Sequence, residues 1–195
     1  MKRAWVFAAL LLGACATTSL MDTWKDPAFS GPPKKRLLVV GVSKSDSNRR
    51  VFEDGFVKAL AASGSGGSPS YAVLPALSAD VNERLAGAVR SAGADGVLVT
   101  RVLRVRRDVE VRTMHSSPGF YGAGFRGYYG HAYGPAYTDV STYDVLTIET
   151  TLWDISKDKP MWSGTSEVTA PKSVAAATEE LAGVLIKKMK ADGVI

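Results

Sequence analysis

Residues that commonly carry catalysis or cross-linking are scarce in this sequence. Cysteine occurs once in 195 residues, as Cys15, and histidine twice, as His115 and His131. A single cysteine excludes a disulfide within the chain and a metal site built from several thiolates. The two histidines are too few for a metal site, and no acidic residue lies between them. We therefore expect a fold held together by packing, with no metal ion.

Long hydrophobic runs are also missing, since no stretch approaches the roughly 20 apolar residues of a membrane-spanning helix. The apolar run Ala4 to Leu12 is shorter, follows Lys2 and Arg3, and ends in small residues before Cys15. A charged start, a short apolar segment and small residues together are typical of a secretory signal. We expect residues 1–14 to be a signal peptide and the mature protein not to span a membrane.

The segment Leu12-Gly13-Ala14-Cys15 resembles the lipobox of bacterial lipoproteins. The resemblance implies a diacylglycerol on the Cys15 thiol and an N-acyl chain on its amine, which together anchor the protein to a membrane. Ala16 stands where Asp would imply the inner membrane, so the same resemblance implies the periplasmic face of the outer membrane. An ordinary secretory signal, in which Cys15 is incidental, is the alternative.

Charge and motif content argue against nucleic-acid and nucleotide ligands. The formal charge is +5, and without Lys2 and Arg3 it falls to about +3. This mildly basic charge does not indicate a nucleic-acid-binding surface. No phosphate-binding loop or dinucleotide fingerprint precedes a helix. We expect no nucleic-acid partner.

Residues 15–33 are rich in Thr, Ser, Pro and Asp, which predicts a lipidated N-terminus followed by a flexible tether. Residues 34–195 are enough for a single domain. Hydrophobic periodicity and capping residues predict eight elements in the order β-α-β-α-β-β-β-α. Their expected places are Arg36 to Val42, a helix capped at Ser45 to Ser47, Ser70 to Leu74, a helix from Ser78 to Gly93, a strand from Val97, Asp139 to Ile155, Met161 to Thr169, and a helix from Ser173 to Asp192.

This order predicts an α/β fold with a mixed five-stranded sheet, helices on its faces and the strand order 2-1-3-4-5. The third strand changes to alternation after Val102, which predicts that it leaves the covered sheet in a long hairpin with the fourth strand. One face of that hairpin is apolar, with Leu103, Val105, Val109 and Val111, and the other is charged, with Arg104, Arg106, Asp108, Glu110 and Arg112.

Several short motifs are similar to those of a family of uncharacterised bacterial envelope lipoproteins. They are Thr23-Trp24-Lys25-Asp26-Pro27, Leu38-Val39-Val40-Gly41-Val42-Ser43, Arg49-Arg50-Val51-Phe52-Glu53-Asp54, Gly93-Ala94-Asp95-Gly96-Val97-Leu98-Val99 and Trp162-Ser163-Gly164. The expected topology resembles that of the curli-secretion lipoprotein, the penicillin-binding-protein activators and the N-terminal domain of the Tol-system propeller protein. The resemblance implies a location in the cell envelope and no particular activity.

Residues 116–138 form a stretch in which glycines alternate with aromatic residues. Tyrosine on a glycine-rich backbone suits adaptable binding of another envelope protein or of wall glycan, whereas a flexible tip whose rings pack on one another is an equal alternative. The candidate partner-binding residues are Phe120, Tyr121, Phe125, Tyr128, Tyr129, Tyr133 and Tyr137.

Two charged clusters are candidates for electrostatic roles. Arg104, Arg106 and Arg112 can contact an anion, although Asp108 and Glu110 dilute them and an ordinary solvated face is favoured. In the motif 49–54, two arginines stand four residues before two carboxylates. This spacing fits an acid-base cluster, but a solvated ion-pair face is more common and is favoured.

Two classes of function remain. We favour a non-enzymatic, membrane-anchored adaptor that contacts a partner through the hairpin and residues 116–138, and we predict no catalytic residues. The alternative is an envelope hydrolase acting on wall or glycan, with a site that the sequence does not reveal. A purely structural lipoprotein is a third possibility. A concave pocket holding a buried carboxylate or histidine with a shifted pKa would favour the enzyme, and an exposed aromatic patch on the hairpin would favour the adaptor.

Overall fold

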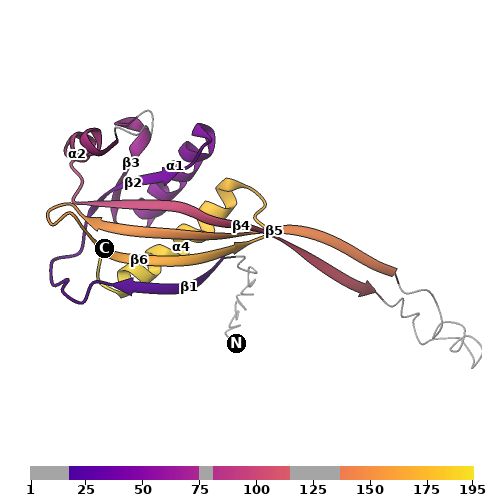
Figure 1. Cartoon of the computed structure of the whole chain (residues 1–195). Helices are drawn as coiled ribbons and strands as arrows, with labels where there is room; N and C mark the ends of the chain where they lie inside the picture. The colour runs from indigo at the N-terminus through magenta and orange to yellow at the C-terminus, as the bar shows by residue number, and fades with distance from the viewer. Residues whose placement is uncertain (1–17, 75–80, 115–136) are drawn as a thin grey trace, which may run out of the picture.

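The computed structural model describes residues 18–74, 81–114 and 137–195. They form an α/β fold with one six-stranded mixed sheet of order β1-β6-β5-β4-β2-β3 (Figure 1). Strand β2 pairs parallel with β3 and with β4. The pairings of β4 with β5, β5 with β6 and β6 with β1 are antiparallel. The strands are β1 (Thr18–Lys25), β2 (Arg36–Val42), β3 (Gly66–Pro69), β4 (Gly96–Met114), β5 (Tyr137–Asp154) and β6 (Lys159–Thr169). The helices are α1 (Asp46–Ala62), the 3-10 turn η1 (Ser70–Ala72), α2 (Val81–Ala92) and α4 (Val174–Ala191).

Hydrophobic cores lie on both faces of the sheet, as the continuous apolar run of β2 predicts. Leu37 and Val39 belong to a larger core with α1 and α4, whereas Leu38 and Val40 belong to a smaller one with α2. Figure 1 shows α1 and α4 behind the sheet and α2 on the opposite side. Strand β2 is therefore the central element, covered by helices on both faces.

The predicted order of the five strands is confirmed, because β3-β2-β4-β5-β6 corresponds to 2-1-3-4-5. Helix caps also fall where expected: the Ser45 side chain accepts from the Asn48 amide, and the Ser173 side chain accepts from the Ala176 amide. Gly93 has a positive φ of 57° directly after α2, which is the conformation that favours glycine after a helix.

The prediction of a flexible tether over residues 15–33 is wrong from Thr18 onward. Residues 18–25 form β1, a sixth strand that pairs antiparallel with β6. The chain beyond it is also held, because the Asp26 amide donates to the Met161 carbonyl and the Lys34 amide donates to the Val194 carbonyl. These pairings cover the outer edge of most of β6, which the sequence predicted to be the edge strand of the sheet.

The strand predicted at Ser70 to Leu74 is also misplaced. The parallel partner of β2 is the shorter β3, and the chain then turns at once into η1. Two glycines form half of β3, and a Cβ at Gly67 would lie 2.9 Å from the Leu60 side chain. This strand consists of residues with low strand propensity because α1 packs directly on its backbone.

Strands β4 and β5 extend beyond the sheet as a long hairpin, as predicted. Pairing of β4 with β2 ends at Arg101, and pairing of β5 with β6 ends at Val145. A bulge at Leu103 marks the point where β4 leaves its neighbour β2. Figure 1 shows the hairpin projecting from the body beside the start of β1. At about 3.3 Å per residue, the part of β4 beyond β2 is roughly 40 Å long.

Among the residues that the structure describes, none of the helices is both long enough and apolar enough to cross a membrane.

Candidate functional site

A pocket of about 420 Å³ opens at the carboxyl end of β2, where the chain passes into α1. Parallel strand β3 lies on one side of β2 and β4 on the other, so this is the point where successive crossovers run in opposite directions. Ligand sites of open α/β sheets commonly form at such a point. The pocket is therefore the first candidate for a binding site in the described residues.

The pocket is predominantly apolar. Its floor is the sheet face of β4 and β5, and its walls come from the first turns of α1 and α4. The apolar side chains that line it include Phe52, Val102, Leu146, Ile148, Val174 and Leu181, and the polar rim includes Ser43, Asn48 and Ser173. No carboxylate or histidine is among its described lining residues, so the pocket offers no general acid or base from these positions.

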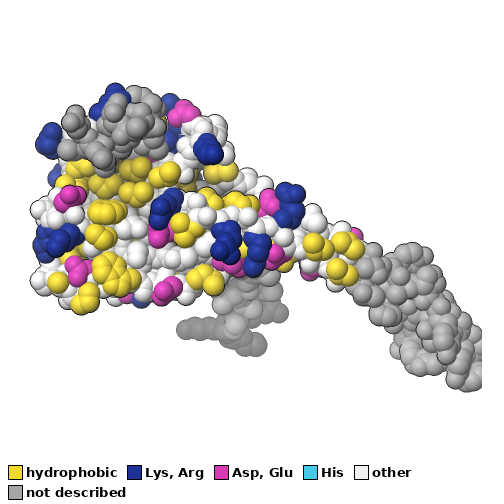
Figure 2. Space-filling view, in the orientation of Figure 1, with side chains coloured by type: hydrophobic (Ala, Val, Ile, Leu, Met, Phe, Trp, Pro, Cys, Tyr) yellow, Lys and Arg dark blue, Asp and Glu magenta, His cyan; other side chains and the backbone are white. Residues whose placement is uncertain are grey.

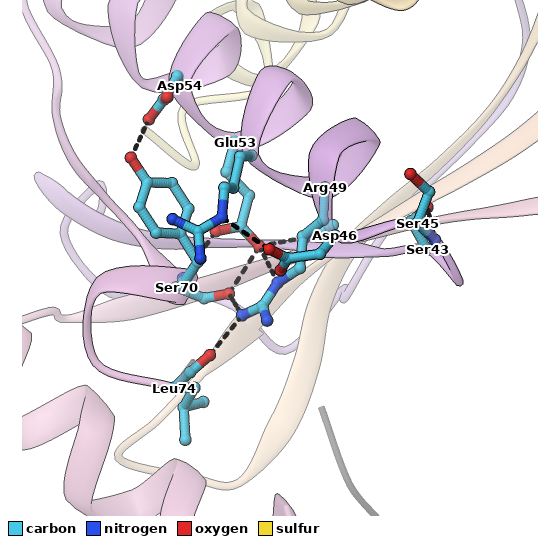
Figure 3. Close-up of polar contacts among 11 residues, drawn as sticks. Ser43, Ser45, Asp46, Arg49, Glu53, Asp54, Ser70 and Leu74 are labelled. Atoms are coloured by element: carbon cyan, nitrogen blue, oxygen red, sulfur yellow. Dashed lines mark hydrogen bonds and ion pairs between the residues drawn. The ribbon is translucent and has the colours of Figure 1, made fainter. Parts of the chain in front are cut away.

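Beneath the pocket, α1 carries a buried ion pair that the sequence predicted to be solvated. Arg49 Nε lies 2.9 Å from Glu53 Oε1, and the two side chains are 3% and 0% exposed. Arg49 also donates to Ser70 Oγ and to the Leu74 carbonyl. Figure 3 shows these side chains converging between α1 and η1. The predicted solvated face is therefore wrong for this pair.

Glu53 is fully occupied by donors. Its Oε1 accepts from the Gly41 amide, Arg49 Nε and Ser70 Oγ, and its Oε2 accepts from the Tyr71 amide. A buried charge is tolerated only when it is paired and hydrogen-bonded in this way. The cluster joins α1 to the end of β2 and to η1, which indicates a structural role, although Arg49 also lines the pocket.

Arg50 and Asp54 both lie on the surface, but each has a different partner from the one predicted. Arg50 Nε lies 2.8 Å from Asp46 Oδ2, and this hydrogen bond raises the pKa of Arg50. Asp54 instead accepts from the Tyr71 hydroxyl at 2.7 Å, which raises the pKa of Tyr71. All of these groups are exposed, so they make an ordinary surface network.

Among the described residues, Asp154 and Asp192 have carboxyl groups with shifted pKa values, and both lie away from the pocket. Burial alone would raise the pKa of Asp154. Hydrogen bonds from Ser156 and Lys34 lower it by more, so that the net pKa lies below the ordinary 3.8. Burial alone would likewise raise the pKa of Asp192, but hydrogen bonds from Lys188 and Trp162 lower it by more, so that its net pKa is also below the ordinary value. Asp154 pairs with Gly96 at the start of β4, and Asp192 follows the end of α4. Both carboxyl groups are ionised ion-pair partners rather than acids.

The hairpin presents an apolar face on the side of the sheet that α1 and α4 cover in the body. Ile148 belongs to the larger core, and the even-numbered positions 146, 144, 142 and 140 of β5 continue the same face outward. On this face Val105, Val109, Val111 and Val140 are each 59% exposed, and the exposed ion pair of Arg107 with Asp144 lies between Val105 and Val109. We call these four residues the valine face.

The opposite face of the hairpin is charged, as predicted. Arg104 and Arg106 lie on it, with Arg106 Nη2 3.0 Å from Asp108 Oδ2. Figure 2 shows Lys or Arg beside Asp or Glu along the base of the hairpin. Mixed signs favour the solvated face over an anion site at Arg106. Arg112 belongs to β4, but its side chain lies outside the description.

The remaining predicted site residues lie outside the described residues. They are Cys15, Phe120, Tyr121, Phe125, Tyr128, Tyr129 and Tyr133, and for Tyr137 only the backbone is described, at the first position of β5. The two histidines, His115 and His131, also lie outside them. Within the described ranges no group of three or more potential metal ligands occurs. The pocket itself was not predicted, because its lining comes from six separate segments.

Comparisons with known proteins give distant likenesses only. No family profile and no curated protein matches the sequence significantly. Among solved structures, the chain is similar to PelC of Paraburkholderia phytofirmans, solved as a dodecamer, with 18% identity over 86% of this chain and 94% of that chain and a TM-score of 0.47. A variant of PelC gives 19% identity over 86% and 95%, with a TM-score of 0.48. Lipoprotein GNA1162 of Neisseria meningitidis gives 14% identity over 80% and 99%, with a TM-score of 0.43. At this level the likenesses decide neither the function nor the assembly of this chain.

Proposed function

We propose that this protein is a lipid-anchored, non-enzymatic binding protein of the bacterial envelope, and that it contacts another envelope protein through the valine face of its hairpin. The valine face is the observation that supports this proposal most strongly. Each of the four valines exposes more than half of its surface, and they lie along one side of a projecting element, with the Arg107–Asp144 ion pair between Val105 and the other three. Large contiguous apolar surfaces on soluble domains usually mark interaction sites.

The backbone of the hairpin supports the same proposal. In the described part, residues 108–114 of β4 and 137–143 of β5 pair only with each other, which leaves both outer edges of the hairpin open. Open edges offer unpaired amides and carbonyls to an extended segment of a partner. The charged opposite face limits indiscriminate pairing of those edges.

The lipid anchor in this proposal rests on the sequence. The signal-like residues 1–14 and the lipobox-like Leu12 to Cys15 support diacylglycerol and N-acyl chains on Cys15. The corresponding location is the periplasmic face of the outer membrane, and residues 116–138, which lie between β4 and β5 in the sequence, are a further proposed contact for protein or wall glycan.

The hydrolase alternative has less support. A hydrolase needs a carboxylate, histidine or activated hydroxyl beside its substrate. The described lining of the pocket holds no acid or histidine, and the carboxyl groups with shifted pKa values lie near the other end of the body, in ion pairs. We therefore propose binding rather than catalysis as the activity.

Photo-cross-linking in living cells tests the proposed interface. A photoreactive phenylalanine analogue placed at Val109 or Val111 is expected to give a discrete adduct with one envelope protein. The matched control places the same analogue at Asp108, between them in sequence and on the opposite face, where at least fivefold less adduct is expected. Equal adduct from both faces would contradict the valine face as the interface.

A further inference from the structure

The pocket at the end of β2 has the character of a site for a flexible apolar chain. Its volume of about 420 Å³ lies within the range of about 300 to 1,000 Å³ that is usual for small-molecule sites. The guanidinium of Arg49 beneath it is engaged by Glu53, Ser70 and Leu74, so no unpaired charge of the buried cluster faces an occupant. Arg101, the other charged residue of the described lining, is paired with Glu149. An uncharged hydrocarbon chain therefore fits the described lining better than an ionic ligand.

Apolar side chains also remain exposed at the mouth of the pocket. Val42 is 51% exposed, Val102 is 48% exposed and Val174 is 38% exposed. All three belong to the lining and come from β2, β4 and α4. An occupant that filled the pocket and covered its mouth would remove this apolar surface from water, which is favourable in proportion to the area covered.

The start of β1 lies close to this pocket. Thr18 pairs with Val168 near the end of β6, and its Oγ1 donates to Glu180 Oε2 of α4 at 3.3 Å. The first two turns of the same helix, from Val174 to Leu181, form one wall of the pocket. From Glu180 to Val174 is about 9 Å along the helix axis at 1.5 Å per residue.

Cys15 precedes Thr18 by only three residues. A chain of three residues spans at most about 11 Å, so the cysteine cannot lie farther than that from the start of β1. An acyl chain attached to Cys15 therefore begins near the wall of the pocket. Because β1 replaces the expected long tether, the attachment point of the anchor is restricted to the end of the sheet where the pocket opens.

We propose that the pocket binds one fatty-acyl chain carried by Cys15 of the same molecule when the protein is not inserted in a membrane. This inference rests on the lipid anchor of the proposed function. In water the pocket shields that acyl chain, and in a bilayer the chain leaves the pocket for the hydrocarbon core. The other chains on Cys15 stay available to a membrane or a carrier. The protein thereby carries a site for part of its own anchor.

Metabolic labelling with a palmitate analogue that carries a terminal diazirine tests this inference on the full chain. The purified protein is illuminated in detergent-free buffer and its peptides are analysed by mass spectrometry. The expected product joins the Cys15 peptide to peptides of α1 or α4 that line the pocket. Mixing light-isotope and heavy-isotope protein before illumination identifies intramolecular products, which contain one isotope only.

Two substitutions on α4 provide a matched comparison. Ala177→Trp fills the pocket and is expected to reduce the intramolecular product at least fivefold, whereas Ala191→Trp, on an exposed position of the same helix, is expected to leave it unchanged. Val174→Trp at the mouth is a second blocking variant, and circular dichroism verifies that each variant is folded.

The other outcomes overturn the inference in distinguishable ways. A labelled Cys15 peptide without products in the pocket would refute the pocket as its site while leaving the anchor intact. Pocket peptides joined to free fatty acid or phospholipid would assign the pocket to external lipid, and mixed-isotope products would assign it to the anchor of a second copy. No label on Cys15 would refute the anchor itself, and the inference with it.

Discussion

Arg49 and Glu53 form a buried ion pair one helical turn apart on α1, with 2.9 Å between Nε and Oε1. The pair connects three segments, because Glu53 accepts from the Gly41 amide and both residues bind Ser70. The carboxyl end of β2, the start of α1 and η1 are thus held in one arrangement, and this arrangement forms one side of the pocket.

The effect of removing one partner of this pair follows directly from its burial. Glu53→Ala leaves the Arg49 guanidinium buried without its counterion, which should lower the free energy of unfolding by about 3–5 kcal/mol. Replacing both residues with methionine should cost less than Glu53→Ala alone, because no charge then remains buried. Urea unfolding followed by circular dichroism measures both effects. As a control, Arg50→Ala removes an exposed ion pair and should lower stability far less than Glu53→Ala does, because solvent screens exposed pairs. Equal losses for Arg50→Ala and Glu53→Ala would contradict the assigned burial.

The motif Trp162-Ser163-Gly164 has a steric explanation. Both Trp162 and Gly164 face the larger core, and a Cβ at position 164 would lie 2.6 Å from the indole ring. Gly164→Ala should therefore destabilise the protein by about 1–3 kcal/mol through overpacking. Gly183→Ala, at an exposed position inside α4 with no atom near the added Cβ, should instead stabilise it by about 0.5–1 kcal/mol. Thermal unfolding compares the two, and a stabilising Gly164→Ala would show that the ring does not occupy this position.

One buried hydroxyl in the described residues has no hydrogen-bond partner. Ser166 Oγ lies on β6 in a side chain that is 1% exposed, and nothing accepts from it or donates to it. Removing an unsatisfied polar atom avoids its desolvation cost, so Ser166→Ala should stabilise the protein by about 1 kcal/mol. Thr178→Val is the comparison, because the Thr178 hydroxyl donates to the Val174 carbonyl. A loss of stability in Ser166→Ala, measured by urea unfolding, would mean that this hydroxyl has a partner in solution.

The ion pair of Lys34 with Asp154 should make stability depend on acidic pH. The pKa of Asp154 is lower in the folded protein than its ordinary 3.8. Its stabilising contribution is therefore complete above about pH 4 and is lost as the pH falls through the folded pKa. Asp154→Asn should remove this part of the dependence, so that wild type and variant differ most at neutral pH and converge as the pH falls through the lowered pKa of Asp154. Unfolding midpoints across pH 2–7 measure the difference, and Asp192 remains in the variant as a second carboxyl of the same kind. A constant difference down to pH 2 would contradict the lowered pKa.

The sequence was sufficient for the order of the central strands. Apolar runs and capping residues place the two crossovers after β2 and β3, and right-handed crossovers then leave few possible orders. The hairpin was also predictable, because alternation from Val105 to Val111 indicates a strand covered on at most one face.

Other features depend on contacts that no local pattern reveals. Strand β1 has one buried side chain, Thr18, and a bulge near Met21 that interrupts alternation, so its sequence resembles a linker. In the sequence, Glu53 and Arg49 resemble a surface ion pair, because only the fold brings the Gly41 amide and Ser70 into contact with them. The pocket likewise arises where segments from five elements and the loop before α4 meet.

The most direct test of the proposed interface measures protection of alternate residues along β4. Single cysteines replace Val105, Asp108, Val109, Glu110 and Val111 in turn. Cys15 is the only other cysteine, and the unsubstituted protein gives its background. Maleimide labelling rates are compared between the purified protein and cells with a permeabilised outer membrane. A partner on the valine face predicts that positions 105, 109 and 111 label at least fivefold more slowly in cells, while 108 and 110 label as in the purified protein. Equal slowing of both faces, or no slowing at all, would contradict the proposal.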